Sequence, residues 1–461
     1  MSKSFVFFII LLTVLKIFAA FSTNFSLFGD EAQYWLWSKK LDIGYLSKPP
    51  LISWMIMLHT FFFGDSFESL KLFPIFFYFF TAIAIYNFSQ KLGLEKNVSV
   101  ICTLTFLILP AVSLSSFLLS TDVILLFFWT ISMGVLLDIR KNASTYNFFI
   151  LGIVLGLAFL SKYAAVYFFI CLFFILFFDN ILRKILFSNK IKFVLFLLVF
   201  IVVVSPNILW NSMNDWLTLD HTSKNANLKN ININFFRGFE FLLIQIFMIG
   251  PILFIGFIMS IKKISYDFEN IFLLSFSVPI LVVVFTEGVV VRANANWAAV
   301  ALVSLFVFFV RSLNYHKNLI ILSNFMVNYV FGVVLFLLIS FSFDHKIFDR
   351  IIGIKEFSYE IKNDLGEISN IVVTDRLLYS SLSYEFRNQK LNFYMPKDPN
   401  HNITKHFQIS SPLNKKMSDD FLLIGDVSDI SYLENAPKVL FIKKYNPKFL
   451  SLPVKIYEIN Y

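Results

Sequence analysis

Long apolar runs separated by short polar connections dominate the first three quarters of this chain. A helix needs roughly 20 apolar residues to cross a bilayer, or fewer when interfacial side chains flank it. The pattern therefore predicts about eleven membrane-spanning helices, at residues 5–22, 70–88, 98–116, 122–138, 146–161, 163–179, 191–208, 240–260, 270–286, 295–310 and 319–342. The apolar segment 50–63 is shorter and begins at a double proline, so we expect a surface helix or one that dips partway into the membrane.

The chain changes character after residue 343. Residues 344–461 are richer in charged and polar side chains and contain the strand-like runs NIVVTD, DFLLIGDV, KVLFIKKY and PVKIYEIN. One helical pattern, RLLYSSLSYEF, follows the first of them. The predicted fold class is an α-helical polytopic membrane domain over 1–343, with surface helices and outer loops at 23–69 and 209–239, followed by a small extracytoplasmic α/β domain over 344–461.

Basic residues indicate how the chain is oriented. If the N-terminus is cytoplasmic, every short inner connection is basic, as the positive-inside rule requires. The residues concerned are Lys91, Lys96, Arg140, Lys141, Arg183, Lys184, Lys190, Lys192, Lys262, Lys263, Arg311 and Lys317. Both outer loops and the C-terminal domain then share the other face. An alternative is that the first span is a cleaved signal peptide, since Lys3 precedes an apolar core that ends at Ala19-Ala20.

Composition supports a membrane protein and excludes several other classes. Of 461 residues, 57% are hydrophobic and 15% charged, with a mean hydropathy of +0.73, which is not typical of a soluble globular protein. The net charge of +9 arises largely at the ends of apolar runs, so we expect a bilayer and no nucleic acid as partner. Cys102 and Cys171 lie within apolar runs and predict neither a disulfide nor a metal site. A Gly-rich phosphate loop, zinc-ligand spacing and a Gly-x-Ser-x-Gly motif are all absent from the sequence, which excludes ATP-driven pumps and common soluble hydrolases.

The stretch FGDEAQYWLWSKKLDIGYLSKPPLISW, which begins at Phe28, places several polar groups against the membrane surface. Asp30 and Glu31 could accept a proton from an attacking hydroxyl, bind a cation, or form an ordinary solvated loop. Lys48 could extend to the lipid headgroups or bind a lipid phosphate. The stiff Pro49-Pro50 pair beside Lys48 favours a held phosphate contact.

Other polar residues on the same predicted face have two interpretations each. Asp122 opens a span after Ser-Thr and could simply cap that helix. Lys162 and Tyr163 occupy a tight outer turn, where a side chain anchored at the interface is the ordinary role. Arg292, Asn294, Asn296 and Trp297 could form an interfacial belt. His221 is a lone loop histidine that could be structural.

Taken in order, these motifs resemble the polytopic GT-C glycosyltransferases, in the branch that holds the lipid A aminoarabinose and galacturonic acid transferases and the protein O-mannosyltransferases. GDEAQYWLWSKKLDIGYLSKPPLISW is similar to their first outer loop: the acidic pair, the Gly-Tyr before Lys-Pro-Pro and the following Trp all match. STDVILLFFW, GLAFLSKYAAV, SPNILWNSMNDW and RANANWAAVA resemble later motifs of the same enzymes. The resemblance covers about the first 340 residues.

The resemblance implies an enzyme with a lumenal or periplasmic active site and a polyprenyl-phosphate sugar as donor. It implies Asp30 as general base with Glu31 as its neighbour, Asp122 as a supporting acid, and Lys48 at the donor phosphate. Lys162 and Arg292 are further candidates for the phosphate, and the substrate loops would contribute Tyr34, Tyr45, Tyr163, His221, Asn296 and Trp297. No cofactor is required, although the three carboxylates could bind a divalent metal if they converge. Trp35, Trp37 and Trp54 would anchor surface helices.

The acceptor and one rival function remain open at this stage. Residues 33–37 differ from the lipid A aminoarabinose enzymes, so a glycolipid such as lipid A, a glycan and a protein hydroxyl are all candidate acceptors. The expected location is a bacterial inner membrane, with a cytoplasmic N-terminus and a periplasmic active site. The rival is a transporter or flippase of an anionic lipid-linked substrate. It predicts charged groups in the middle of the spans, whereas nearly all of them fall at the outer ends.

Overall fold

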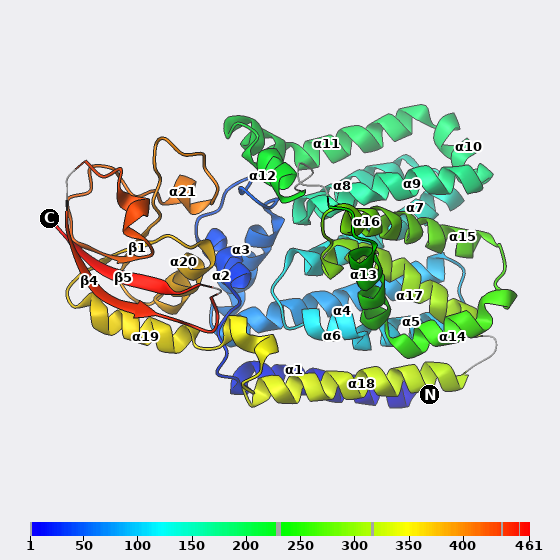
Figure 1. Ribbon diagram of the computed structural model, residues 1–461. Helices are drawn as coiled ribbons and strands as arrows, with labels where there is room; N and C mark the ends of the chain where they lie inside the picture. Colours follow the sequence, from blue (N-terminus) through cyan, green and yellow to red (C-terminus); the bar gives the residue numbers. More distant parts are fainter. Residues whose placement is uncertain (1, 227–231, 315–317, 435–436, 451) are drawn as a thin grey trace.

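The computed structural model describes residues 2–226, 232–314, 318–434, 437–450 and 452–461. Residues 227–231 of the predicted second outer loop and Lys317 of a predicted basic connection lie outside the described residues. The chain forms a bundle of helices with a small sheet domain at one end (Figure 1). The N-terminus lies at the opposite end of the bundle (Figure 1).

Helices follow one another along the whole bundle. They are α1 (Ser2–Ser22), α2 (Gly29–Lys39), α3 (Leu51–Phe63), α4 (Phe67–Lys91), α5 (Lys96–Ile108), α6 (Pro110–Ser115), α7 (Thr121–Lys141), α8 (Thr145–Ser161), α9 (Tyr167–Phe178), α10 (Asn180–Ser188), α11 (Lys190–Met213), α12 (Leu217–Ala226), α13 (Phe235–Ile249), α14 (Pro251–Ser260), α15 (Phe268–Ser275), α16 (Val278–Val290), α17 (Ala299–Asn314) and α18 (Asn318–Ser340). Two short 3₁₀ turns, η1 (Tyr163–Val166) and η3 (Ala295–Ala298), lead into α9 and α17.

Each of the eleven predicted spans falls on a helix or on two consecutive helices. Within the described residues, 7 helical segments are long and apolar enough to cross a membrane, or 9 if two bent pairs each count as one span. The two remaining predicted spans correspond to α5 and α8, which are apolar but shorter. The surface segment predicted at 50–63 corresponds to α3.

One predicted span is bent where a straight helix was expected. The segment 240–260 turns by 98° between α13 and α14. Gly250 has a φ of 110° there, which glycine tolerates, and Pro251 starts the next helix because it cannot continue the previous one. The predicted span 163–179 ends with α9, and a bend of 112° separates it from α10. Asp179 caps α10 by accepting a hydrogen bond from the Ile181 amide at 3.0 Å.

Aromatic rings and glycines set how closely the bundle helices pack. α1 and α18 run side by side along one edge (Figure 1), where Phe5 and Phe325 stack with ring centroids 3.8 Å apart. α8 lies against α11 because Gly152 and Gly156 carry no side chain. A Cβ at Gly156 would lie 2.7 Å from the Val203 side chain.

Residues after α18 build the sheet domain. Its strands are β1 (Asn370–Val373), β2 (Asn392–Tyr394), β3 (Phe421–Ile424), β4 (Lys438–Tyr445) and β5 (Val454–Asn460), in the spatial order β2-β1-β3-β5-β4. β1 is parallel to β2 and β3, with Ile371 opposite Leu422, and β5 is antiparallel to β3 and β4. The helices are α19 (Ile354–Leu365), α20 (Arg376–Glu385) and α21 (Phe407–Ser410). The four predicted strands and the helix α20 are present, whereas β2 and α19 were not predicted.

The sheet domain docks on the first outer loop through α20 and α2. A Cβ at Gly29 would lie 2.7 Å from the Leu377 Cβ, so glycine at this position lets the two helices approach. Trp35 packs edge-on against Tyr384 with centroids 4.9 Å apart, and the Tyr384 hydroxyl donates to the Asp65 carbonyl at 3.2 Å. Trp35 is therefore buried against the C-terminal domain, at the place where the acidic pair of α2 lies.

Candidate active site

Asp30 lies in the first turn of α2, at the junction between the bundle and the C-terminal domain. The Arg376 guanidinium, from α20, donates to Asp30 Oδ1 at 2.9 Å. The same guanidinium nitrogen donates to the Gln33 side-chain oxygen. The Asp30 side chain is 39% exposed and that of Arg376 34%, so the pair is accessible from one side.

Glu31, the neighbour of Asp30, points the other way and is only 1% exposed. Lys71 on α4 donates to both of its carboxylate oxygens at 2.7 Å. The amides of Leu119 and Phe28 donate to the same carboxylate at 2.7 and 2.8 Å. This carboxylate is fully used in joining α2, α4 and the segment before α7, so the structure separates Glu31 from the accessible Asp30.

Asp122 belongs to a second, largely buried cluster at the start of α7. Its Oδ1 accepts a hydrogen bond from the Lys162 ammonium at 2.6 Å, and its Oδ2 accepts one from the Asn296 amide at 2.9 Å. The Lys162 ammonium also lies 3.4 Å from the Asn296 carbonyl. Helix capping was the alternative role for Asp122, but no side-chain cap bond forms at this helix start. Three motifs that are far apart in the sequence therefore meet here.

Lys48 lies within electrostatic reach of both Asp30 and Asp122. Its backbone is held by reciprocal hydrogen bonds with Tyr45, at 3.2 and 3.3 Å, just before the two prolines. Burial lowers the pKa of Lys48 below the ordinary lysine value, and the nearby Lys162 ammonium lowers it further. Asp122, Asp30 and Arg376 also lie close enough to act on its charge. Among the described residues, no carboxylate pairs directly with the Lys48 ammonium.

Aromatic side chains fix the loop that carries Lys48. Tyr45 is fully buried, stacks on Trp37 at 4.2 Å and donates its hydroxyl proton to the Trp37 carbonyl at 3.2 Å. The indole of Trp210, at the end of α11, donates to the Asp42 carboxylate at 2.8 Å. A Cβ at Gly44 would lie 2.6 Å from the Trp210 ring, which explains the glycine before Tyr45. Trp37 is thus buried in the protein, as Trp35 is, whereas a surface anchor was expected.

The remaining predicted site residues divide into those near the cluster and those away from it. Tyr34 is buried, and Asp30 lies close enough to it to raise its pKa, after the larger effect of burial. His221 on α12 is half-buried, and burial, Arg376 and Lys48 all lower its pKa. Both residues therefore border the cluster.

Three other predicted residues have their described side-chain contacts outside the cluster. The Tyr163 hydroxyl donates to Asn207 on α11 at 3.0 Å, and Trp297 is half-buried in the turn before α17. Arg292 is exposed and acts electrostatically on Glu287 of α16. The described contacts of Arg292 do not include Asp30, Asp122 or Lys48.

The three carboxylates do not converge on one point. In the part of the chain that the structure describes, no group of three His, Cys, Asp or Glu side chains could hold a metal ion. The positive charges beside Asp30 and Asp122 come from Arg376 and Lys162 instead.

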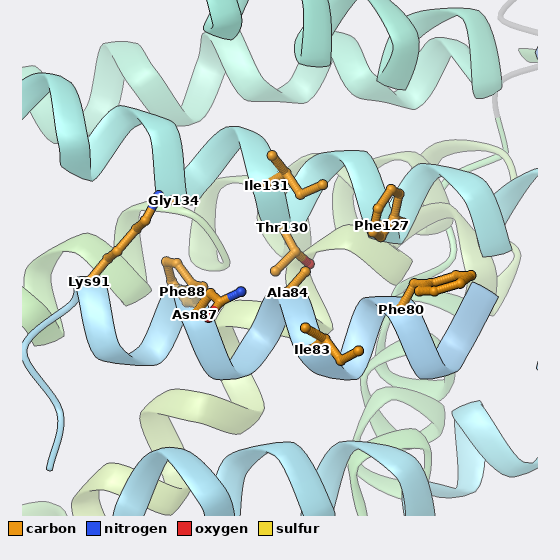
Figure 2. Close-up of a pocket in the computed structure, with 10 residues that line it drawn as sticks. All are labelled: Phe80, Ile83, Ala84, Asn87, Phe88, Lys91, Phe127, Thr130, Ile131 and Gly134. Atoms are coloured by element: carbon orange, nitrogen blue, oxygen red, sulfur yellow. The ribbon is translucent and has the colours of Figure 1, made fainter. Parts of the chain in front are cut away.

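A cavity of about 340 Å³ lies between α4 and α7 (Figure 2). It begins about one and a half helical turns along α7 from Asp122 and extends toward the basic end of the bundle. Its walls are mainly apolar, with polar groups at Asn87, Lys91 and Thr130; the other lining residues are Phe80, Ile83, Ala84, Phe88, Phe127, Ile131 and Gly134. The same two helices therefore carry Lys71 and Asp122 at one end and an apolar cavity further along.

Sequence reasoning missed Arg376, Gln33 and Lys71. Gln33 lies one helical turn after Asp30, a spacing that was available in the sequence. Arg376 starts the predicted helix RLLYSSLSYEF, but its contact with residue 30 spans 346 positions. No local pattern signals such a contact.

Comparison with known proteins agrees with the motifs. Residues 47–210 match the sequence family described as dolichyl-phosphate-mannose-protein mannosyltransferase. The lipid A galacturonosyltransferase RgtD of Rhizobium johnstonii is 32% identical over 285 residues, covering 60% of this chain and 58% of that protein. The matched region thus spans less than two thirds of that relative.

Solved structures share the fold at low sequence identity. ArnT from Cupriavidus metallidurans in the apo state matches with a TM-score of 0.67 and 11% identity, covering 98% of this chain and 97% of ArnT. The Archaeoglobus fulgidus oligosaccharyltransferase, in complex with zinc and sulfate, matches with a TM-score of 0.52 and 12% identity, covering 97% and 72%. These findings confirm the predicted polytopic helical fold class and the resemblance to the GT-C glycosyltransferases.

Proposed function

We propose that this chain is an integral membrane glycosyltransferase that moves a sugar from a polyprenyl-phosphate donor to an extracytoplasmic hydroxyl. The observation that carries the proposal is the meeting of Asp30, Asp122, Lys48 and Lys162 at the end of the bundle where the C-terminal domain docks. An accessible carboxylate can act as a base there, and the cations can hold an anionic leaving group.

The proposed reaction is a single displacement with Asp30 as base. The acceptor hydroxyl gives its proton to the Asp30 carboxylate while its oxygen forms a bond to the anomeric carbon of the donor sugar. The bond from that carbon to the phosphate oxygen breaks, and polyprenyl phosphate leaves with the electron pair. Attack from the face opposite the phosphate inverts the anomeric carbon. Correct placement of both substrates supplies much of the rate enhancement.

Charge at the site suits a donor with one phosphate. Lys162 pairs with Asp122 and Arg376 pairs with Asp30, which leaves Lys48 as the cation without a direct carboxylate partner in the described site. A phosphodiester carries one negative charge, so Lys48 can balance it. We propose that the reaction needs no metal, because the ammonium groups provide the positive charge that a metal would otherwise supply.

The bundle also offers an apolar environment for a lipid-linked substrate. The cavity between α4 and α7 has mostly apolar walls and lies along α7, whose first turn carries Asp122 (Figure 2). We propose a bacterial inner-membrane location, with the N-terminus cytoplasmic and the site periplasmic. Because one relative is named a lipid A galacturonosyltransferase, a lipid A-like glycolipid is the acceptor that we propose first, before a glycan or a protein.

The rival function, transport of an anionic lipid, has one observation in its favour. Lys16 is buried within α1 and lies 5.4 Å from the Phe336 ring, so one cation does occur inside a span. However, the charged groups of the candidate site all lie at one end of the bundle. A Lys16→Met variant separates the two functions, because transport along the span would be lost whereas glycosyl transfer would be retained.

The test compares the glycolipids and periplasmic proteins of four strains by mass spectrometry. One strain lacks the gene, and the other three express the wild type, Asp30→Asn or Asp65→Asn at matched levels. Asp65 is a control from the same loop, with an exposed ion pair to Lys39 at 2.7 Å. We expect one defined sugar to disappear in the null and Asp30→Asn strains only. Restoration of that sugar by Asp30→Asn would rule out Asp30 as the base, and an unchanged glycan profile in the null strain would favour transport.

A further inference from the structure

Among the described contacts, Arg376 is the one residue of the C-terminal domain that bonds to the Asp30 carboxylate. Its Nη1 contacts both Asp30 and Gln33, which lie one turn apart on α2. Arginine suits this role because its planar guanidinium presents several donors in fixed directions. The bond to Asp30 uses Oδ1, and no hydrogen bond to Oδ2 occurs among the described residues.

The position of Arg376 is set by how α20 begins. Asp375 caps this helix, since its carboxylate accepts a hydrogen bond from the Leu378 amide at 2.8 Å. The next residue after Arg376, Leu377, packs against Gly29 at a distance that no larger residue would allow without a shift. Arg376 and Asp30 are therefore the sequence neighbours of the two residues at which the helices touch, so docking of the domain determines where the guanidinium lies.

From this geometry we propose that Arg376 is a positioning residue for glycosyl transfer, and that the C-terminal domain thereby completes the active site. The inference rests on the proposed function, with Asp30 as base. Arg376 holds Oδ1 so that Oδ2 faces the acceptor hydroxyl. When the acceptor oxygen bonds to the anomeric carbon and the phosphate leaves, the hydroxyl proton passes to Oδ2, and Arg376 keeps all its protons. The domain would then control the rate of transfer without binding the donor.

The experiment measures steady-state transfer by the purified full chain in detergent, with the sugar identified by the strain comparison above. It compares the wild type with Arg376→Gln, Arg376→Lys and the control Arg387→Gln. Arg387 lies in the same domain and stacks on Tyr384 at 4.2 Å, away from Asp30. Displacement of a reacting group by about 1 Å can cost about 100-fold in rate, so we expect kcat to fall about 10- to 100-fold in Arg376→Gln.

Two further readouts separate positioning from a structural role. We expect KM for donor and acceptor to change less than about threefold, and the thermal unfolding temperature to match that of Arg387→Gln, because the pair with Asp30 is partly exposed. Arg376→Lys should be intermediate in kcat, since an ammonium keeps the charge but not the planar geometry. An unchanged kcat in Arg376→Gln, an effect on donor KM alone, or an equal loss of kcat in Arg387→Gln would each overturn the inference. An inactive wild type would instead overturn the proposed function, and the inference with it.

Discussion

Lys71 and Glu31 form a buried ion pair in which the ammonium donates to both carboxylate oxygens at 2.7 Å and also to the Phe117 carbonyl at 3.1 Å. Both side chains are at most 3% exposed. The pair joins α2 to α4 at the residue next to the accessible Asp30. A charge so buried is costly unless its partner remains, so the pair fixes the acidic loop to the bundle.

Replacement of Lys71 by Met should destabilise the protein strongly. It leaves the Glu31 carboxylate buried without its counter-charge, which costs about 3–5 kcal/mol. The double variant Lys71→Met with Glu31→Gln should recover much of that loss, because no unpaired charge remains. Thermal unfolding in detergent checks both. If Glu31→Gln alone abolished transfer in a stably folded protein, Glu31 would have a chemical role besides this structural one.

Lys48 should make donor use sensitive to alkaline pH. Burial and Lys162 lower the Lys48 pKa, so the ammonium loses its proton at a lower pH than an ordinary lysine does. Asp122 and Asp30 oppose this shift and Arg376 adds to it. As pH rises through the lowered pKa, the positive charge is lost and KM for the donor should increase. Lys48→Ala should raise that KM most below the lowered pKa, where the wild-type ammonium is charged, and change acceptor KM less.

A charge-preserving variant provides the control for this pH dependence. Lys48→Arg stays protonated at all accessible pH values, so its donor KM should no longer rise on the alkaline side. The shape of the profile is compared, since the larger side chain can lower activity throughout. Lys39→Arg, in an exposed pair, should keep the wild-type shape. If donor KM still rose at alkaline pH in Lys48→Arg, the rise would come from the titration of another group.

Loss of the Asn296 amide should impair transfer. Asn296 donates to Asp122 Oδ2 at 2.9 Å, and hydrogen bonds to charged groups contribute about 1.5–3 kcal/mol, so Asn296→Ala should reduce kcat/KM by about tenfold or more. Asn294→Ala is the matched control, because only its backbone carbonyl has a described bond, to the Trp297 amide. Equal activity in the two variants would exclude a functional Asp122–Asn296 contact.

Apolar periodicity and turn residues were enough to predict most of the fold. The span predicted at 122–138, for example, is mainly apolar between its two terminal aspartates and appears as one helix, α7. The break at Gly250 and Pro251 was missed because hydropathy alone does not register a bend. β2 was missed because its three residues, Asn392–Tyr394, are too short to show alternation and acquire their conformation by pairing with β1.

The candidate site was predictable where a motif carried its own chemistry. Asp30, Lys48, Asp122 and Lys162 stand in recognisable motifs, and the structure brings them together. The different surroundings of Asp30 and Glu31 were not predictable, because adjacent helical residues point about 100° apart and Lys71 lies 40 positions away in the sequence. The contribution of Arg376 depends on how a separate domain docks, which no local pattern encodes.

Chelation should leave transfer unaffected. No three metal-ligating side chains come together in the ranges that the structure describes, and Lys48 and Lys162 can balance the donor phosphate. We therefore expect activity within about twofold of the untreated enzyme after prolonged EDTA treatment, and no stimulation by Mg²⁺ or Mn²⁺. Activity that falls on chelation and returns with one of these ions would contradict a metal-free reaction.

His406 should make the docked first loop less stable in acid. It is 5% exposed and packs edge-on against the stacked rings of Trp37 and Tyr45, and burial lowers its pKa from 6.5 to about 4. Because the folded-state value is the lower one, the unfolded chain binds a proton first. The contribution of the neutral His406 ring to folding stability is therefore fully present above about pH 6.5 and decreases as pH falls toward 4.

His406→Phe keeps an aromatic ring but cannot bind this proton, so its unfolding temperature should decline less than that of the wild type between pH 7.5 and 4.5. The exposed His401→Phe should decline as the wild type does, and parallel curves for all three proteins would exclude His406 as the source.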